Sequence, residues 1–362
     1  MSIAQTTDRA ERLVSLLPEA GVDLILVTDL VNVRYLTGYT GSNGLALVGP
    51  QTRSFITDFR YVEQAAEQVD SSFARHQAQL ELIDAVDDVL PDGTLALGFE
   101  SEHLTVRQYE RLRELLPDRV SLVAVGGLVE QLRAVKEPEE IARIHEAAKL
   151  ADTALEQVID EGLGGRTERG VALSLTNAMY RLGAERPSFE AIVAAAAHGA
   201  RPHAMPRDVE IAPGQLVVID WGAELDGYCS DCTRTFAAGE PGAEGRELYA
   251  LVLEAQLTGI RAVRAGAAGR QVDAVARAVI EAAGHGEHFG HGLGHGVGLA
   301  IHEAPRLSQR SDAVLQAGNV VTVEPGVYLP GRFGIRIEDL IVVSDDGCEI
   351  LTSLSKDLTI TD

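Results

Sequence analysis

Hydrophobic and polar residues alternate between helical and strand spacing through the first third of the chain. Residues 8–17 place apolar side chains at the spacing of an amphipathic helix, and residues 23–28 form a short apolar run typical of a buried strand. The same criteria predict further strands at 45–48, 53–57 and 95–99, and further helices at 61–68, 80–90 and 106–116. This alternation predicts an α/β domain.

The pattern changes near residue 127. The pair Gly126-Gly127 precedes a charged segment, 138–160, whose glutamate-rich start and lack of interior glycine predict a long helix. Beyond it the sequence predicts two hairpins (211–220 with 228–236, and 320–328 with 334–343) and two further helices (247–264 and 270–283). With 362 residues the chain exceeds what one hydrophobic core usually organises. We therefore expect an α/β domain at 1–128 and an α+β domain at 129–362.

Composition removes several classes of function. The chain has 54 Asp and Glu against 31 Lys and Arg, a net charge of −23, which argues against binding to nucleic acid or to an anionic membrane. No apolar run approaches the ~20 residues of a membrane helix. Three cysteines are too few for a disulfide scaffold and indicate a reducing compartment. A soluble cytoplasmic protein is expected.

The first predicted hairpin carries two aspartates, Asp220 and Asp231. If its turn centres on Leu225-Asp226, the two aspartates are equally far from the tip and face each other, with Cβ atoms roughly 5 Å apart. Two carboxylates held that close repel unless a cation or a proton lies between them. The pair is therefore a candidate for metal binding.

The second hairpin repeats this arrangement, because Glu324 and Glu338 are equidistant from Gly331. Acids on a solvated strand face would be the ordinary explanation for one such pair. Here both pairs are embedded in apolar runs, 217–221 and 320–323, which makes a solvated face the weaker explanation.

Histidines strengthen the interpretation. Five of the ten lie within 18 residues: His285, His288, His291, His295 and His302. The stretch 291–302 is too rich in glycine for a helix and suits a backbone that approaches a site closely. Four carboxylates with one imidazole favour Mn²⁺, Co²⁺ or Zn²⁺, and two such ions could activate a water molecule at neutral pH. The remaining imidazoles would serve proton transfer or stabilise an oxyanion.

Other motifs are weaker. Cys229 and Cys232 have the spacing of a zinc knuckle, but the chain lacks a second such pair. Phosphate-binding loops, the serine nucleophile elbow and the H-E-x-x-H zinc motif do not occur in the sequence.

From about residue 130 onward the chain resembles the pita-bread metallopeptidases, which include methionine aminopeptidase, aminopeptidase P and prolidase. The motifs that carry this resemblance are Val218-Ile-Asp-Trp-Gly, Ser230-Asp-Cys-Thr-Arg-Thr-Phe, His291-Gly-Leu-Gly-His-Gly-Val-Gly, Thr322-Val-Glu-Pro-Gly-Val-Tyr and Gly334-Ile-Arg-Ile-Glu-Asp. It implies a curved, mainly antiparallel sheet and five metal ligands: Asp220, Asp231, His295, Glu324 and Glu338. It also implies that Asp231 and Glu338 bridge two metal ions and that Glu324 takes a proton from the attacking water.

The resemblance extends to residues around these ligands. His203 falls where the family keeps a substrate-binding histidine, and His291 and His302 match two imidazoles that steady the scissile carbonyl and the tetrahedral intermediate. Arg336 resembles an arginine that braces the metal ligands. His285 and His288 match no functional residue of the family.

Residues 29–44, Asp-Leu-Val-Asn-Val-Arg-Tyr-Leu-Thr-Gly-Tyr-Thr-Gly-Ser-Asn-Gly, resemble the creatinase-like amino domain of prolidase and aminopeptidase P. Methionine aminopeptidases lack this domain, which argues against them. The creatinase branch has lost the metal ligands, and so would an inactive peptide-binding module, whereas this sequence keeps all five. The resemblance also implies a homodimer in which the partner's amino domain helps to close the site.

Two specificities remain open. An Xaa-Pro dipeptidase and an Xaa-Pro aminopeptidase both cleave before proline, but only the second accepts residues beyond it. The segment His302-Glu-Ala-Pro-Arg306 resembles a prolidase segment whose arginine clamps the free carboxylate of the proline. We therefore expect a dipeptidase, with two divalent ions per subunit, Mn²⁺ first and Co²⁺ or Zn²⁺ as alternatives.

Overall fold

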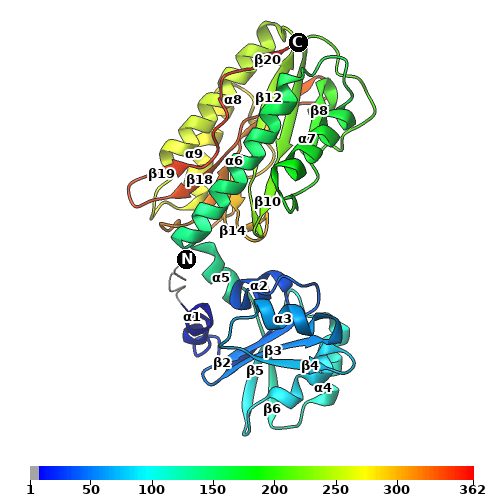
Figure 1. Ribbon diagram of the computed structural model, residues 1–362. Coiled ribbons are helices and arrows are strands. Elements are labelled where there is room, and N and C mark those ends of the chain that lie inside the picture. Colours follow the sequence, from blue (N-terminus) through cyan, green and yellow to red (C-terminus); the bar gives the residue numbers. More distant parts are fainter. Residues whose placement is uncertain (1–7) are drawn as a thin grey trace. The chain divides into compact units, whose positions relative to one another are not determined.

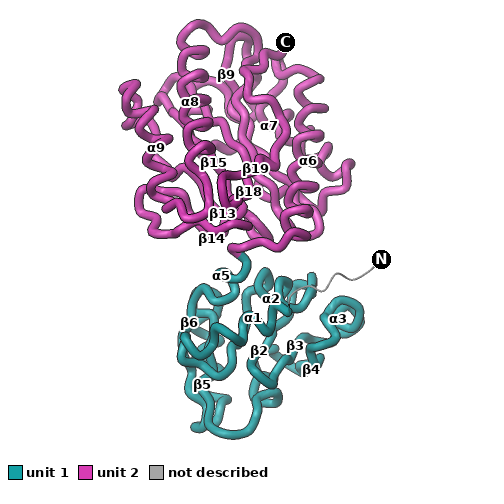
Figure 2. The backbone as a smooth tube through the Cα atoms, turned by 90° about the vertical axis from the view of Figure 1, so that its left-hand side faces the viewer, with its two compact units in different colours: residues 1–133 teal, residues 134–362 magenta. Residues whose placement is uncertain are grey.

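The computed structural model describes residues 8–362, which divide into two compact units with the boundary between Arg133 and Ala134 (Figure 2). The sequence predicts a boundary at residue 128, directly after Gly126-Gly127. A short helix, α5 (Leu128–Ala134), follows these glycines instead. It belongs with the first unit, since the Arg133 guanidinium donates to Asn32 Oδ1 at 2.7 Å and Asn32 donates to Glu130.

The first unit is built on a mixed six-stranded sheet in the order β4-β3-β2-β1-β5-β6 (Figure 1). Its strands are β1 (Leu24–Val27), β2 (Leu45–Gly49), β3 (Thr52–Asp58), β4 (Ala74–Ala78), β5 (Leu95–Glu100) and β6 (Val120–Val125). Its other helices are α1 (Arg9–Leu16), α2 (Leu30–Thr37), α3 (Val62–Gln68) and α4 (Val106–Leu115). Every residue of the central strand β1 is buried, as its continuous apolar run predicts.

Three parts of this unit differ from the sequence prediction. Residues 80–90 form two short 3₁₀ turns rather than an α-helix, because three aspartates without a basic residue favour local turns over a helix interior. The helix α2 was missed, although Asp29 caps its start and Gly38, at φ 79°, ends it. The outer strands β4 and β6 were also missed. Polar, exposed residues interrupt the apolar pattern of β4, whereas β6 is mostly apolar but only partly buried.

The second unit contains a four-stranded sheet, β20-β12-β9-β8, and a five-stranded sheet, β14-β13-β15-β18-β19, with two smaller sheets, β11-β10-β7 and β16-β17 (Figure 1). Within this second unit, neighbouring strands pair antiparallel except β12 with β20, which are parallel. Strands of the first and third sheets are β7 (Arg186–Pro187), β8 (Ile192–Ala195), β9 (Gln215–Trp221), β10 (Ala223–Leu225), β11 (Tyr228–Cys229), β12 (Cys232–Ala238) and β20 (Ile360–Thr361). The others are β13 (Gly294–Gly296), β14 (Glu303–Leu307), β15 (Val320–Val323), β16 (Gly326–Leu329), β17 (Phe333–Arg336), β18 (Asp339–Val343) and β19 (Cys348–Ile350).

Four helices cover these sheets: α6 (Pro138–Asp160), α7 (Glu168–Leu182), α8 (Gly242–Ala262) and α9 (Gly269–Ala282). Apolar faces of α8 and α9 pack on β15 and β18, and those of α6 and α7 pack on β9. Burial of these faces drives the layers together. No helix within residues 8–362 is long and apolar enough to cross a bilayer.

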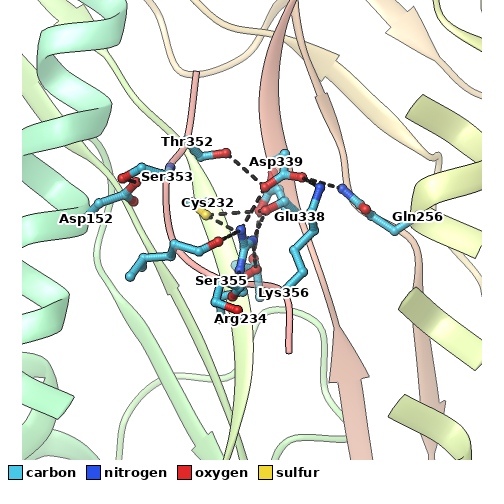
Figure 3. Close-up of polar contacts among 12 residues, drawn as sticks. Asp152, Cys232, Arg234, Gln256, Glu338, Asp339, Thr352, Ser353, Ser355 and Lys356 are labelled. Carbon is cyan, nitrogen blue, oxygen red and sulfur yellow. Dashed lines mark hydrogen bonds and ion pairs between the residues drawn. The ribbon is translucent and has the colours of Figure 1, made fainter. Parts of the chain in front are cut away.

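A buried ion pair joins the layers of the second unit (Figure 3). The Arg234 guanidinium on β12 lies 2.7 Å from Asp339 on β18, and both side chains are almost fully buried. Asp339 also accepts hydrogen bonds from Gln256 of α8, Thr352 and Lys356. Arg234 donates further to the carbonyl oxygens of Leu354 and Ser355. The pair thus ties two strands, one helix and the C-terminal segment together.

Replacing Arg234 by Met should destabilise this unit strongly, because Asp339 would remain as a buried charge without its main partner. We expect a loss of about 3–5 kcal/mol in the free energy of unfolding. Urea denaturation followed by fluorescence of Trp221, the one tryptophan of the chain and a core residue of this unit, measures the change. Arg246→Met, which breaks an exposed pair with Glu240, is the matched control and should leave the midpoint unchanged. Equal midpoints for the two variants would contradict this account.

Candidate metal centre

The second hairpin brings Glu324 and Glu338 to opposite positions, as the sequence predicts. One register runs through both of its ladders, with Val323 opposite Asp339 in β15–β18 and Gly326 opposite Arg336 in β16–β17. Glu324 and Glu338 occupy the gap between the two ladders. The predicted register is confirmed because the turn does centre on Gly331, at φ 76°.

The register of the first hairpin differs from the prediction. Asp220 is opposite Thr233, not Asp231, because the turn centres on Asp226-Gly227. Both turn residues have positive φ, 49° and 82°, which is the geometry of a two-residue hairpin turn. The register therefore moves by two residues. An even shift keeps a side chain on its face of the sheet, so Asp231 still shares a face with Asp220.

Glycine allows His295 to reach these acids. A Cβ atom on the neighbouring Gly294 would lie 2.0 Å from the carbonyl oxygen of Thr322, so only glycine permits this approach of β13 to β15. The His295 amide then donates to Thr322 Oγ1 at 3.1 Å. In this way, two strands place the imidazole beside the second hairpin.

The tautomer of His295 leaves a lone pair available for a cation. Its Nδ1 lies 3.1 Å from the Gly296 carbonyl oxygen, which only accepts, so Nδ1 carries the hydrogen. Burial lowers the pKa of His295 to about 3, so the ring is neutral and Nε2 presents a lone pair. That lone pair faces Asp231 Oδ2 at 3.5 Å and Glu324 Oε1 at 3.4 Å. Acceptors face acceptors here, an arrangement that a metal ion would stabilise.

The carboxylates give the same indication. Burial and mutual repulsion raise the pKa values of Asp231 and Glu338, and burial raises the pKa of Asp220 and brings that of Glu324 to about 7. Among the described residues, Asp220 Oδ1 is buried without a hydrogen-bond partner. Ligand atoms of Asp231, His295 and Glu338 lie within 4.8 Å of one another. Such a set of carboxylate oxygens and one imidazole nitrogen fits a divalent cation.

Hydroxyl groups and one guanidinium orient the acids. Thr233 Oγ1 donates to Glu338 Oε2 at 2.7 Å, and Thr322 Oγ1 donates to Glu324 Oε1 at 3.1 Å. Arg336 lies 2.7 Å from Asp220 Oδ2. The family resemblance implies that Arg336 braces the ligands. Neither threonine was anticipated from the sequence, although each lies within two residues of a proposed ligand.

His291 is held by a hydrogen-bonded chain that starts at Arg336. Arg336 Nη1 donates to the Tyr328 hydroxyl at 2.8 Å, and this hydroxyl lies 2.9 Å from His291 Nε2. His291 Nδ1 must donate to the Gly292 carbonyl oxygen at 2.8 Å, so Nε2 accepts from Tyr328. Burial lowers the pKa of His291 to about 4, which agrees with this neutral tautomer. Tyr328 was not anticipated from the sequence.

The acids line one side of a cavity of about 510 Å³, a size typical of small-molecule sites. His203, His302 and Arg306, all exposed, also line it, and the His302 ring lies 4.5 Å from that of His295. Apolar lining comes from Phe189, Ile192, Ala204, Met205 and Ile301. The cavity therefore combines acidic groups with imidazoles, the guanidinium groups of Arg306 and Arg336, and an apolar surface.

Other candidate residues lie apart from this cavity in the described structure. His285 and His288 pair with each other through their Nδ1 atoms at 3.2 Å. Cys229 and Cys232 are buried and unpaired by disulfide, and burial raises the pKa of both thiols. None of these four residues lines the cavity.

Comparison with known proteins agrees with these features. Residues 142–345 match Metallopeptidase family M24, and residues 9–135 match the Creatinase/Prolidase N-terminal domain. Both resemblances seen in the sequence motifs are confirmed, and with them the two fold classes.

Relatives match over nearly the whole chain. An Xaa-Pro dipeptidase of Pyrococcus furiosus is 34% identical, covering 97% of this chain and 99% of its own. The structure of an Xaa-Pro dipeptidase from Bacillus anthracis is 43% identical with a TM-score of 0.94, covering 97% of this chain and 99% of its own. That of an X-Pro aminopeptidase from Thermotoga maritima is 36% identical with a TM-score of 0.89, covering 98% and 100%.

Replacing Glu338 by Gln should weaken divalent-metal binding, because the amide removes a negative oxygen from the buried cluster. We expect a loss of more than roughly 100-fold in affinity, the upper range for residues that only support a ligand. Elemental analysis after dialysis against a metal buffer measures it. Glu247→Gln, on the exposed face of α8, is the control. Unchanged metal content in the Glu338 variant would contradict the assignment of Glu338 as a ligand.

Proposed function

The chain belongs to metallopeptidase family M24 and carries the creatinase/prolidase type of N-terminal domain, and from this premise we propose that it is an Xaa-Pro dipeptidase. It would hydrolyse the peptide bond that precedes proline in dipeptides. The observation that carries the proposal is the complete set of acids and one neutral imidazole on one side of the cavity. Relatives and solved structures of similar sequence are named Xaa-Pro dipeptidase.

Five residues would hold two divalent ions per subunit: Asp220, Asp231, His295, Glu324 and Glu338. When bound, such ions polarise a carbonyl and lower the pKa of water to near neutrality. The set tolerates several ions, and Mn²⁺ is proposed first, with Co²⁺ and Zn²⁺ as alternatives. We further propose that the protein is cytoplasmic, because all three cysteines are free. The family resemblance supports a homodimer.

Residues of the chain would then bind substrate and move protons. Glu324, fixed at Oε1 by Thr322, would accept the proton of the attacking water. His203 and His302 would orient the scissile carbonyl by hydrogen bonding. Burial and the neighbouring Arg306 lower the pKa of His302, so at neutral pH it is an uncharged donor. His291, held by Tyr328, would help to steady the tetrahedral intermediate.

Arg306 would supply the selectivity for dipeptides. Its guanidinium lines the cavity on β14 and can pair with the free carboxylate of a C-terminal proline. A longer peptide lacks a carboxylate at that position. An Xaa-Pro aminopeptidase is the second candidate, because the similar Thermotoga maritima structure carries that name. A metal-free amidinohydrolase or an inactive binding module would not require the intact acid cluster.

Removal of metal should abolish hydrolysis of Ala-Pro, because no ion would remain to polarise the carbonyl and lower the pKa of the attacking water. We expect dialysis against a chelator to remove activity and added Mn²⁺ to restore most of it, measured by release of free proline. Elemental analysis would verify that the ions had left. Full activity in protein shown to be free of metal would refute the proposed function.

Comparison of Ala-Pro with Ala-Pro-Ala should separate the two specificities. We expect strong preference for the dipeptide, and Arg306→Ala should raise its KM by roughly 10–100-fold, the effect of losing a charge-assisted hydrogen bond. Arg310→Ala, at an exposed arginine outside the cavity lining, is the matched control. Equal cleavage of both peptides by the unaltered enzyme would instead establish the aminopeptidase.

A further inference from the structure

One wall of the cavity is a loop, residues 196–206, that follows β8. It contributes four lining residues: Pro202, His203, Ala204 and Met205. We propose that Glu168, which lies outside the cavity, is a positioning residue that closes this loop at both ends and so sets where His203 meets the substrate. The inference rests on the proposed function for its kinetic part, and its structural part can be tested independently.

The Glu168 carboxylate contacts the start of the loop. Its Oε1 accepts from the amide of Ala195, the last residue of β8, at 2.9 Å. The His198 ring, itself buried, donates from Nδ1 to Oε2 at 2.9 Å. Ala196, between these two residues, has a φ of 49°, which is uncommon for a residue with a Cβ atom. The entry to the loop is therefore held in a specific conformation by one acceptor group.

The same carboxylate contacts the end of the loop. Glu168 Oε2 accepts from the Arg207 amide at 3.1 Å and from Arg207 Nε at 3.0 Å, and Oε1 accepts from Arg207 Nη2 at 3.1 Å. The two ends, Ala195 and Arg207, thus converge on a single side chain. The loop also contacts the metal side directly, where Arg336 Nη1 donates to the Pro202 carbonyl oxygen at 3.2 Å.

The position of Glu168 in the fold explains how its buried carboxylate stays ionised and accepts these hydrogen bonds. It is the first residue of α7, directly after the N-cap Thr167, where the helix terminus favours a negative charge. Glu168 is fully buried, and Arg207 covers it from the surface. Although burial alone would raise its pKa, the donors of Arg207, Ala195 and His198 lower it below the ordinary value. The group is therefore an anion at neutral pH and accepts every one of these hydrogen bonds.

Glu168→Gln tests this role with little change in size. The amide keeps one accepting oxygen but turns the other atom into a donor, which then faces donors of Arg207 or His198. We expect the two ends of the loop to become more mobile. KM for Ala-Pro should rise about tenfold while kcat changes less than about threefold, because about one hydrogen bond that positions the loop is lost. Metal content should stay unchanged. Amide hydrogen exchange in peptides covering 196–207 should become faster.

Glu224→Gln is the matched control. Glu224 on β10 is likewise a buried carboxylate paired with an exposed arginine, Arg186, at 2.7 Å, but none of its recorded hydrogen bonds or ion pairs is to the loop. Its variant should leave KM and exchange in 196–207 unaltered. If both variants raise KM equally, or if Glu168→Gln changes neither KM nor exchange, the positioning role is wrong. Loss of metal from Glu168→Gln would also overturn it.

Arg207→Met provides a second variant if Glu168→Gln does not fold. Arg207 is half exposed and its removal frees only the far end of the loop, so KM should rise in the same direction by a smaller factor and exchange should increase at 203–207. Unaltered KM and exchange in Arg207→Met would count against the proposal. If the unaltered protein did not cleave Ala-Pro at all, the proposed function would fail, whereas faster exchange in 196–207 would still establish that Glu168 holds the loop.

Discussion

Mutual repulsion among buried carboxylates is the constraint on which the second unit depends. Acids from two hairpins and the lone pair of a neutral histidine converge where both ladders are interrupted. The surroundings compensate only in part: Thr233 and Thr322 donate one hydrogen bond each, and Arg336 supplies one positive charge. A divalent cation would supply the positive charge that is still lacking. The fold that brings the carboxylates together therefore also creates the requirement for a metal ion.

Strand alternation separates this centre from the structural ion pair beside it. Thr233 donates to the carboxylate of Glu338, which lines the cavity. The next residues along each strand, Arg234 and Asp339, pair with each other in the core (Figure 3). Two adjacent acids, Glu338 and Asp339, therefore have different tasks because successive side chains point to opposite faces. The buried salt bridge fixes the strands that present the ligands, which couples the stability of the core to the geometry of the site.

Features that depend on neighbouring residues could be predicted from the sequence, whereas features that depend on distant contacts could not. The register of the second hairpin was predicted because glycine and proline mark its turn, while that of the first moved by two residues because Asp226-Gly227 forms the turn. Asp220 and Asp231 still lie on the same face of the sheet, so the two-residue shift in register leaves the candidate site unchanged. Tyr328 and Glu168 could not be found in this way, because their partners are distant in sequence and meet only when the sheets and helices pack.

Both walls of the cavity are supported by carboxylates that lie outside it. Glu168 holds the wall that carries His203, and Glu303 supports the wall that carries His302 and Arg306, accepting from the Ala300 amide at 2.9 Å and pairing with buried Lys136 at 3.0 Å. Neither acid is a proposed metal ligand. Both walls are nevertheless connected to the proposed ligands, because Arg336, which pairs with Asp220, also donates to the Pro202 carbonyl oxygen, and Arg306 is opposite His295 in the β13–β14 pair. The groups that would receive the substrate are therefore tied to the residues that would hold the metal.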